Sequence, residues 1–122
     1  MSDLHWLTAA DAARQIARRE LSPVVLMEAL LDRTARLDPR LNAFIRVDAE
    51  AAMAAALAAE AEAKAGRLRG PLHGVPVGIK DIIDVAGLPT TGHSKILKDN
   101  VATADAVCVE KLRGAGAIVV GK

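Results

Sequence analysis

Residues 1–66 carry apolar side chains at the three- and four-residue intervals of amphipathic helices. Thr8, followed three positions later by Asp11, is a variant capping box and opens a first predicted helix that ends near Arg19. This part of the chain therefore predicts a mainly helical leader.

The second predicted helix begins after Ser22, which is followed by a proline in the first helical position, where a missing N–H costs nothing. Its apolar positions with helical spacing are Leu26, Met27, Leu30, Leu31 and Leu37. We expect the helix to end at Asp38-Pro39, because the residue before a proline disfavours helical geometry.

Residues 43–47 (AFIRV) predict a short strand, and Asp48 should cap a third helix. Glu60 and Lys64 lie one turn apart on one face of that helix, the spacing of a favourable charge pair. Gly66 is the predicted C-terminal stop of the helix.

The pattern changes beyond Arg67, where prolines and closely spaced glycines exclude a helix. The glycines recur at every fourth residue, at Gly66, Gly70, Gly74 and Gly78. Val77 and Ile79 nevertheless predict a strand, which the intervening glycine interrupts. Residues 87–100 are polar and predict a loop.

Thr103 should cap a helix to about Arg113, and residues 117–120 form the continuous apolar run of a buried strand. Strand, crossover helix and strand make a βαβ unit with parallel strands. The predicted fold class is therefore α/β, with a helical leader over 1–66 and a strand-loop-helix-strand unit over 67–122.

Only three strands are predicted, so at least one hydrophobic edge of the sheet would be bare and open to pairing with another chain. The last predicted strand is followed at once by Gly121-Lys122, with no capping element. We interpret residues 1–122 as the N-terminal part of one longer α/β domain, truncated here. A small three-stranded domain is the alternative, and a homo-oligomer stays open.

The composition of the chain points to a cytoplasmic protein. A net charge of +1 gives no field that would argue for nucleic acid or an anionic membrane as partner. The longest uncharged apolar run, 51–59, is too short to cross a bilayer, and the N-terminus lacks a secretory signal. The single cysteine, Cys108, lies between two valines and predicts a buried structural thiol.

Lys80 is the candidate catalytic residue, because it stands at the end of the predicted strand in GPLHGVPVGIKD, residues 70–81. Most lysines are solvated and paired, and Asp81 is an adjacent partner, so this position alone favours a structural role. Burial would disfavour the charged form of the amine, however, and a neutral lysine can act as a base.

The wider sequence resembles the amidase signature family. The resemblance rests on GPLHGVPVGIKDIIDVAGLPTTGHSKIL at 70–97 and DAVCVEKLRGAGAIVVGK at 105–122, with SPVVLMEALLDRTARLDPRLNAFIRVDAE at 22–50 similar to the family's N-terminal region. It implies a Ser-cisSer-Lys triad that hydrolyses a carboxylic amide through an acyl-enzyme, with Lys80 as the base. It implies a small-molecule amide substrate and neither a metal nor an organic cofactor.

Within this resemblance the triad is incomplete, since both family serines would lie beyond Lys122. The serines present are Ser2, Ser22 and Ser94, none of which matches a catalytic position. We therefore expect the chain alone to be inactive, because acyl transfer needs a nucleophile near its base. One alternative is the glutaminase subunit of the tRNA-dependent amidotransferase, which works with partner subunits. Another is an inactive fragment that only associates with the rest of its fold.

Two further motifs are weaker. Residues 116–122 match the spacing G-x-x-x-x-G-K of a phosphate-binding loop, but their isoleucine and valines favour a strand, so nucleotide binding is disfavoured. His5, His73, His93 and Cys108 have no metal-chelating spacing. We expect hydrogen bonds within its loop for His73, exposure for His93, and backbone-satisfying roles for the hydroxyls of 88–94.

Overall fold

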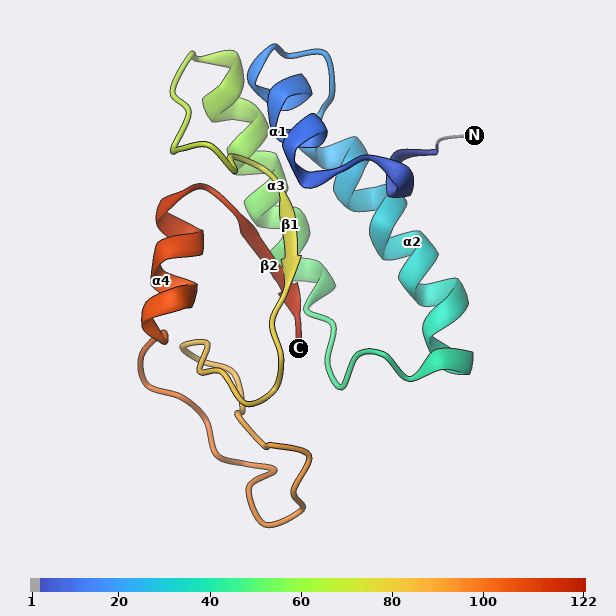
Figure 1. Cartoon of the computed structure of the whole chain (residues 1–122), viewed down its shortest axis with the longest axis vertical. Helices are drawn as coiled ribbons and strands as arrows, with labels where there is room; N and C mark the ends of the chain where they lie inside the picture. Colours follow the sequence, from blue (N-terminus) through green and yellow to red (C-terminus); the bar gives the residue numbers. More distant parts are fainter. Residues whose placement is uncertain (1–2) are drawn as a thin grey trace.

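A computed structural model describes residues 3–122 as four helices and a two-stranded sheet, after a short 3-10 turn at Leu4–Trp6 (Figure 1). The elements are α1 (Ala9–Ala17), α2 (Pro23–Leu41), α3 (Ala49–Lys64), β1 (Pro76–Gly78), α4 (Val107–Gly114) and β2 (Ile118–Gly121). The α/β class is confirmed, and β1, α4 and β2 form the predicted βαβ unit with parallel strands.

The sheet lies between two helical layers (Figure 1). Ile118 and Val120 of β2 pack on one face against α2 and α3. Val77 and Val119 pack on the other face, in the cluster built around Val109 of α4. This division follows from the two-residue period of a strand, which sends alternate side chains to opposite faces.

Alanines form the buried face of α3, as shown by Ala52, Ala56, Ala59 and Ala63. Their small side chains let α3 lie close to β2 and α2. The predicted pair of Glu60 and Lys64 forms at 3.3 Å, and Gly66 ends the helix with a positive φ of 73°.

The predicted caps of α1 and α2 are confirmed, but α2 does not end at Pro39. Thr8 accepts the N–H of Asp11, and Ser22 accepts the N–H groups at the start of α2. The helix continues to Leu41 because the Asp38 carboxylate accepts the N–H groups of Ala43 and Phe44, which bonds the chain that leaves the helix. These bonds to residues five and six positions further along the chain offset the proline's preference.

Two other boundaries also differ from prediction. Residues 43–47 form no strand; only Val47 makes an isolated antiparallel bridge, to Gly121. The last helix begins at Val107 rather than after Thr103, because the Asp105 carboxylate accepts the N–H of Ala86 at 2.8 Å. That bond holds the segment before α4 against the preceding loop.

Cys108 is exposed, so the prediction of a buried thiol is wrong. Val109 is the residue of α4 that faces the sheet, with none of its surface exposed. Val107 and Cys108 therefore lie off the buried face, and Val107 is 67% exposed. No helix in residues 3–122 is long and apolar enough to span a membrane.

Gly121 lies where the backbone passes close to Arg46 and Val47. A Cβ at this position would lie 2.1 Å from the backbone oxygen of Arg46. The close approach allows Lys122 to exchange backbone hydrogen bonds with Arg46, at 2.9 and 3.1 Å. Only glycine fits here without moving the backbone.

Gly121→Ala should therefore lower the free energy of unfolding by about 1 to 3 kcal/mol through overpacking. Gly114→Ala is the matched control, because a Cβ there meets nothing within 4 Å and Gly114 lies in α4, where alanine is favoured. Urea unfolding followed by circular dichroism measures both. Equal stability of the two variants would contradict the close contact.

Candidate active site

The candidate site forms where the two strands end. Because β1 and β2 are parallel, with Gly78 opposite Gly121, the residues that follow them meet at one edge of the sheet. Lys80 and Asp81 follow β1, and Lys122 follows β2. Three charged side chains are thus brought together.

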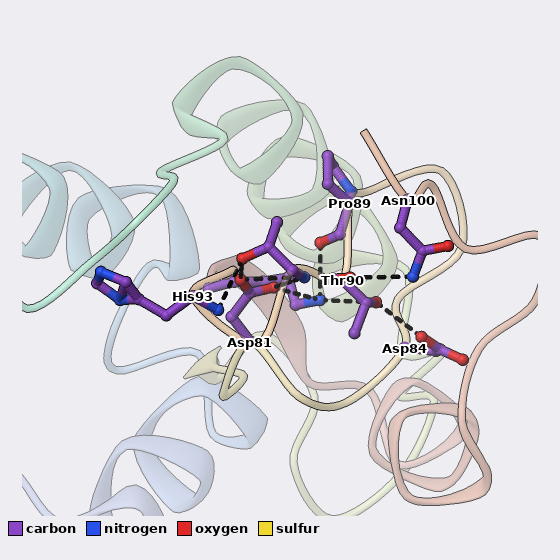
Figure 2. Close-up of polar contacts among 8 residues, drawn as sticks. Asp81, Asp84, Pro89, Thr90, His93 and Asn100 are labelled. Atoms are coloured by element: carbon purple, nitrogen blue, oxygen red, sulfur yellow. Dashed lines mark hydrogen bonds and ion pairs between the residues drawn. The ribbon is translucent and has the colours of Figure 1, made fainter. Parts of the chain in front are cut away.

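Asp81 is buried, and both its carboxylate and its backbone oxygen accept hydrogen bonds (Figure 2). Its carboxylate accepts the N–H of Thr91 at 3.2 Å and the Thr91 hydroxyl, and it pairs with the Lys122 ammonium at 3.0 Å. Its backbone oxygen also accepts the N–H of Gly92 at 2.8 Å. The sequence suggested a carboxylate that orients or neutralises Lys80; the structure instead pairs Asp81 with Lys122.

Lys122 has only 2% of its side chain exposed, and each of its ammonium protons has an acceptor. Besides Asp81, these acceptors are the backbone oxygen of Pro89 at 2.9 Å and the Thr90 hydroxyl at 3.1 Å. These three acceptors fix the position of the ammonium.

The loop over 87–100 continues this network (Figure 2). The Thr90 hydroxyl accepts from Lys122 and donates to Asp84 at 2.7 Å. Asn100 donates to the backbone oxygen of Thr90 at 3.0 Å. The loop hydroxyls therefore satisfy charged side chains, which the sequence did not predict, in addition to backbone groups.

Burial acts to raise the pKa of Asp81, but the hydrogen bonds from Thr91 and Lys122 outweigh it and leave this pKa below its ordinary value. Asp81 is therefore ionised at neutral pH. The negative charge is balanced by one ammonium, which makes the buried pair neutral.

Lys80 is exposed, in contrast to the buried amine that the sequence predicted. Its neighbours Ile79 and Asp81 are both buried, so the alternation of an extended chain turns Lys80 outward. Within residues 3–122 it forms no ion pair. Its backbone is nevertheless held, since its oxygen accepts the N–H of Ile83 and the N–H of Ile79 donates to Gly121, each at 3.0 Å.

Lys80 lines an open cavity of about 460 Å³. Its lining comes from four places: the end of β1 with the residues after it, the residue after β2, the segment 42–45, and the loop at 92–93. His93 also lines the cavity, and its ring points away from the ion pair in Figure 2. A volume of this size suits a small organic molecule.

The described serines have structural roles. Ser22 caps α2 and donates to Glu60, and the Ser94 hydroxyl accepts the N–H of Ile96 at 3.2 Å. Ser2 lies outside the described residues. Neither described serine is paired with Lys80, as a nucleophile activated by this lysine would require.

The remaining motifs have packing roles. His73 is buried, accepts the N–H of Arg69 at 3.1 Å, and donates to the backbone oxygen of Ala59 at 2.8 Å, so it bonds α3 as well as its own loop. His93 is exposed, as predicted. Residues 3–122 contain no cluster of three or more His, Cys, Asp or Glu suited to a metal. Residues 118–121 form β2, so no phosphate-binding loop exists there.

Lys122 is the site residue that sequence reasoning missed, because it was interpreted only within the phosphate-loop motif. A usable signal was present. Lys80 follows the first predicted strand directly, Lys122 follows the second after Gly121, and the carboxyl ends of parallel strands lie at one edge. That rule alone would have placed Lys122 beside Lys80 and Asp81.

Comparisons with known proteins agree on one family. A family model described as Amidase matches residues 25–122. An acylamidase of Rhodococcus erythropolis is 43% identical over 120 residues, which are 98% of this chain and 25% of the relative. A glutamyl-tRNA(Gln) amidotransferase subunit of Acidothermus cellulolyticus is 46% identical over 122 residues, 100% of this chain and 24% of the relative. The chain spans about a quarter of the length of these curated relatives.

Solved structures give the same result. The native peptide amidase of Stenotrophomonas maltophilia matches with a TM-score of 0.89 and 38% identity, over 98% of this chain and 25% of that one. A bacterial aryl acylamidase of the amidase signature family matches with a TM-score of 0.89 and 29% identity, over the same shares.

Asp81→Asn should lower the free energy of unfolding at pH 7 by about 3 kcal/mol, because it leaves the buried Lys122 ammonium without its counter-charge. The pKa of Asp81 is lower in the folded chain, so its stabilising effect is present at neutral pH and is lost as the pH falls below about 4. Urea unfolding should show that the free energies of unfolding of Asp81→Asn and of the wild type differ less at pH 3 than at pH 7. Asp99→Asn, at an exposed site, is the control and should show no such trend.

Proposed function

The chain belongs to the amidase signature family, and we propose that it contributes Lys80, the base, to an enzyme that hydrolyses a carboxylic amide. The observation that carries this proposal is the environment of Lys80. Its backbone is fixed at the end of β1, while its amine is unpaired within residues 3–122 and faces a cavity of about 460 Å³. In this proposal residues 1–122 are the N-terminal part of a single amidase domain.

The proposed mechanism uses a Ser-cisSer-Lys triad whose two serines lie outside this chain. The neutral amine of Lys80 accepts a proton from the bridging serine, which takes one from the nucleophilic serine. The serine oxygen attacks the amide carbon, and the proton held by Lys80 passes back through the bridging serine to the amide nitrogen. The C–N bond then breaks, and the nitrogen leaves as a neutral amine or ammonia. Water then hydrolyses the acyl-serine to the acid. Donors for the oxyanion would surround the nucleophile, and so would also lie outside the chain.

A second candidate is the ammonia-releasing subunit of an amidotransferase, since many relatives, at 41 to 46% identity, carry the name of a glutamyl-tRNA(Gln) amidotransferase subunit. The same triad would then hydrolyse glutamine and pass ammonia to partner subunits. The substrate of the full-length protein discriminates between the candidates. Turnover of simple amides without partners favours the amidase, and glutamine hydrolysis that requires partner subunits favours the amidotransferase.

In the full-length protein, Lys80→Ala should reduce kcat by about a hundredfold to ten-thousandfold, the contribution typical of a general base. The fold should be unaffected, because the side chain is exposed and forms no ion pair within residues 3–122. Lys111→Ala, which removes an exposed lysine on α4, is the matched control and should keep full activity. Amide hydrolysis and circular dichroism measure both effects; an active Lys80→Ala variant would remove Lys80 from the mechanism.

The 122-residue chain alone should show no amide hydrolysis, because neither of its described serines is placed to serve as the nucleophile. An aryl amide that releases a coloured amine provides the assay. Full-length protein at equal concentration is the positive control. Turnover by the short chain, abolished by Ser94→Ala, would show that a nucleophile is present here after all.

A further inference from the structure

The ion pair of Asp81 and Lys122 has a consequence for the residue next to it. Lys80 directly precedes Asp81 in the chain, and both residues line the same cavity as Lys122. A lysine that must accept a proton is hindered by a nearby carboxylate, because a negative charge favours the ammonium form. The proposed base therefore shares a cavity with a carboxylate whose charge opposes its function, although the exposed Lys80 side chain forms no ion pair with Asp81.

The Lys122 ammonium neutralises the Asp81 carboxylate. Its ammonium lies 3.0 Å from an Asp81 oxygen, in a place where only 2% of the Lys122 side chain and 8% of the Asp81 side chain are exposed. Little water is available there to screen the carboxylate, so the main source of neutralising charge is the lysine. The pair as a whole carries no net charge.

The other groups around the cavity do not replace this effect. His93 is the remaining titratable residue that lines it, and its side chain is exposed. Arg46, Lys95 and Lys98 line a neighbouring cavity that Asp81 and Lys122 also line, but all three are exposed and none forms an ion pair with Asp81. The segment 42–45 contributes Asn42, Ala43, Phe44 and Ile45, none of which is charged. Thr91 donates two hydrogen bonds to Asp81, but these leave the full negative charge in place.

We propose that Lys122 is the counter-ion of Asp81, and that this neutralisation allows Lys80 to give up its proton and serve as the base. This inference rests on the proposed function. Lys122 is a positioning residue in this scheme, since it acts on Lys80 through Asp81 and has no need to touch the substrate. The two lysines at the strand ends thus have opposite roles. Lys122 supplies a positive charge to Asp81, and Lys80 serves as the base.

The test measures kcat/KM against pH in the full-length amidase, where the acidic limb of the profile reports protonation of the base. Lys122→Met leaves the Asp81 charge unbalanced and should move this limb about one pH unit higher, which lowers kcat/KM about tenfold on its acidic side. Asp81→Asn leaves the Lys122 charge unbalanced and should move the acidic limb to lower pH. The double variant, which is neutral at both positions, should return the limb to the wild-type pH.

Lys111→Met controls for the loss of one positive charge and should not move the limb, because Lys111 is exposed on α4. A purely structural role for the pair predicts lower activity in both single variants with no movement of the limb, and that result would overturn the inference. If a single variant does not fold, the double variant decides, because it contains no unpaired buried charge. A folded double variant as inactive as Lys80→Ala would also overturn the inference.

The outcomes separate this inference from the proposed function. Full activity of Lys80→Ala would refute the function itself, whatever the other variants do. An inactive Lys80→Ala combined with unmoved limbs in Lys122→Met and Asp81→Asn would refute only the role of Lys122. Shifts of opposite sign in those two variants support both.

Discussion

Asp81 and Lys122 bring opposite charges to within 3.0 Å in a place nearly closed to water, where either charge alone would be costly. Each partner belongs to the end of a different strand, and both also bind the loop over 89–92. The pair therefore joins three separate segments at one point. A buried ion pair adds little net stability over apolar residues of similar volume. We expect its main effect to be on geometry, since both charges find their partners when these segments come together.

Most of the local signals in the sequence predicted the helix ends correctly, but Asp48, at the N-cap position of α3, makes no capping hydrogen bond with its side chain. Thr8, Ser22 and Gly66 mark helix ends correctly, because each acts on backbone groups within a few residues. Two of the boundaries that were wrong depend on more distant partners. Asp105 holds Ala86, nineteen positions away, and delays the start of α4. Residues 43–47 meet the end of β2, more than seventy positions later in the chain, and Gly121 permits the contact.

The candidate site could be predicted in part for the same reason. Family resemblance selected Lys80, a single residue in a specific motif. The partner of Asp81 could not be found by looking along the chain, where Lys80 is the nearest cation, because burial and exposure alternate between Lys80 and Asp81. The true partner lies forty-one positions later and becomes a neighbour only through the parallel pairing of β1 and β2. Topology, rather than proximity in sequence, decided the pairing.

The arrangement also explains how a mobile side chain can be part of a precise site. Lysine loses considerable conformational entropy when it is held in one position, so most of the required precision must come from the backbone that carries it. Here hydrogen bonds hold the backbone on both sides of Lys80: Ile79 donates to Gly121, and Asp81 accepts from Gly92. The amine itself stays free within residues 3–122. A partner serine then needs to order only the four-carbon side chain, which is a much smaller entropic cost than ordering a loop.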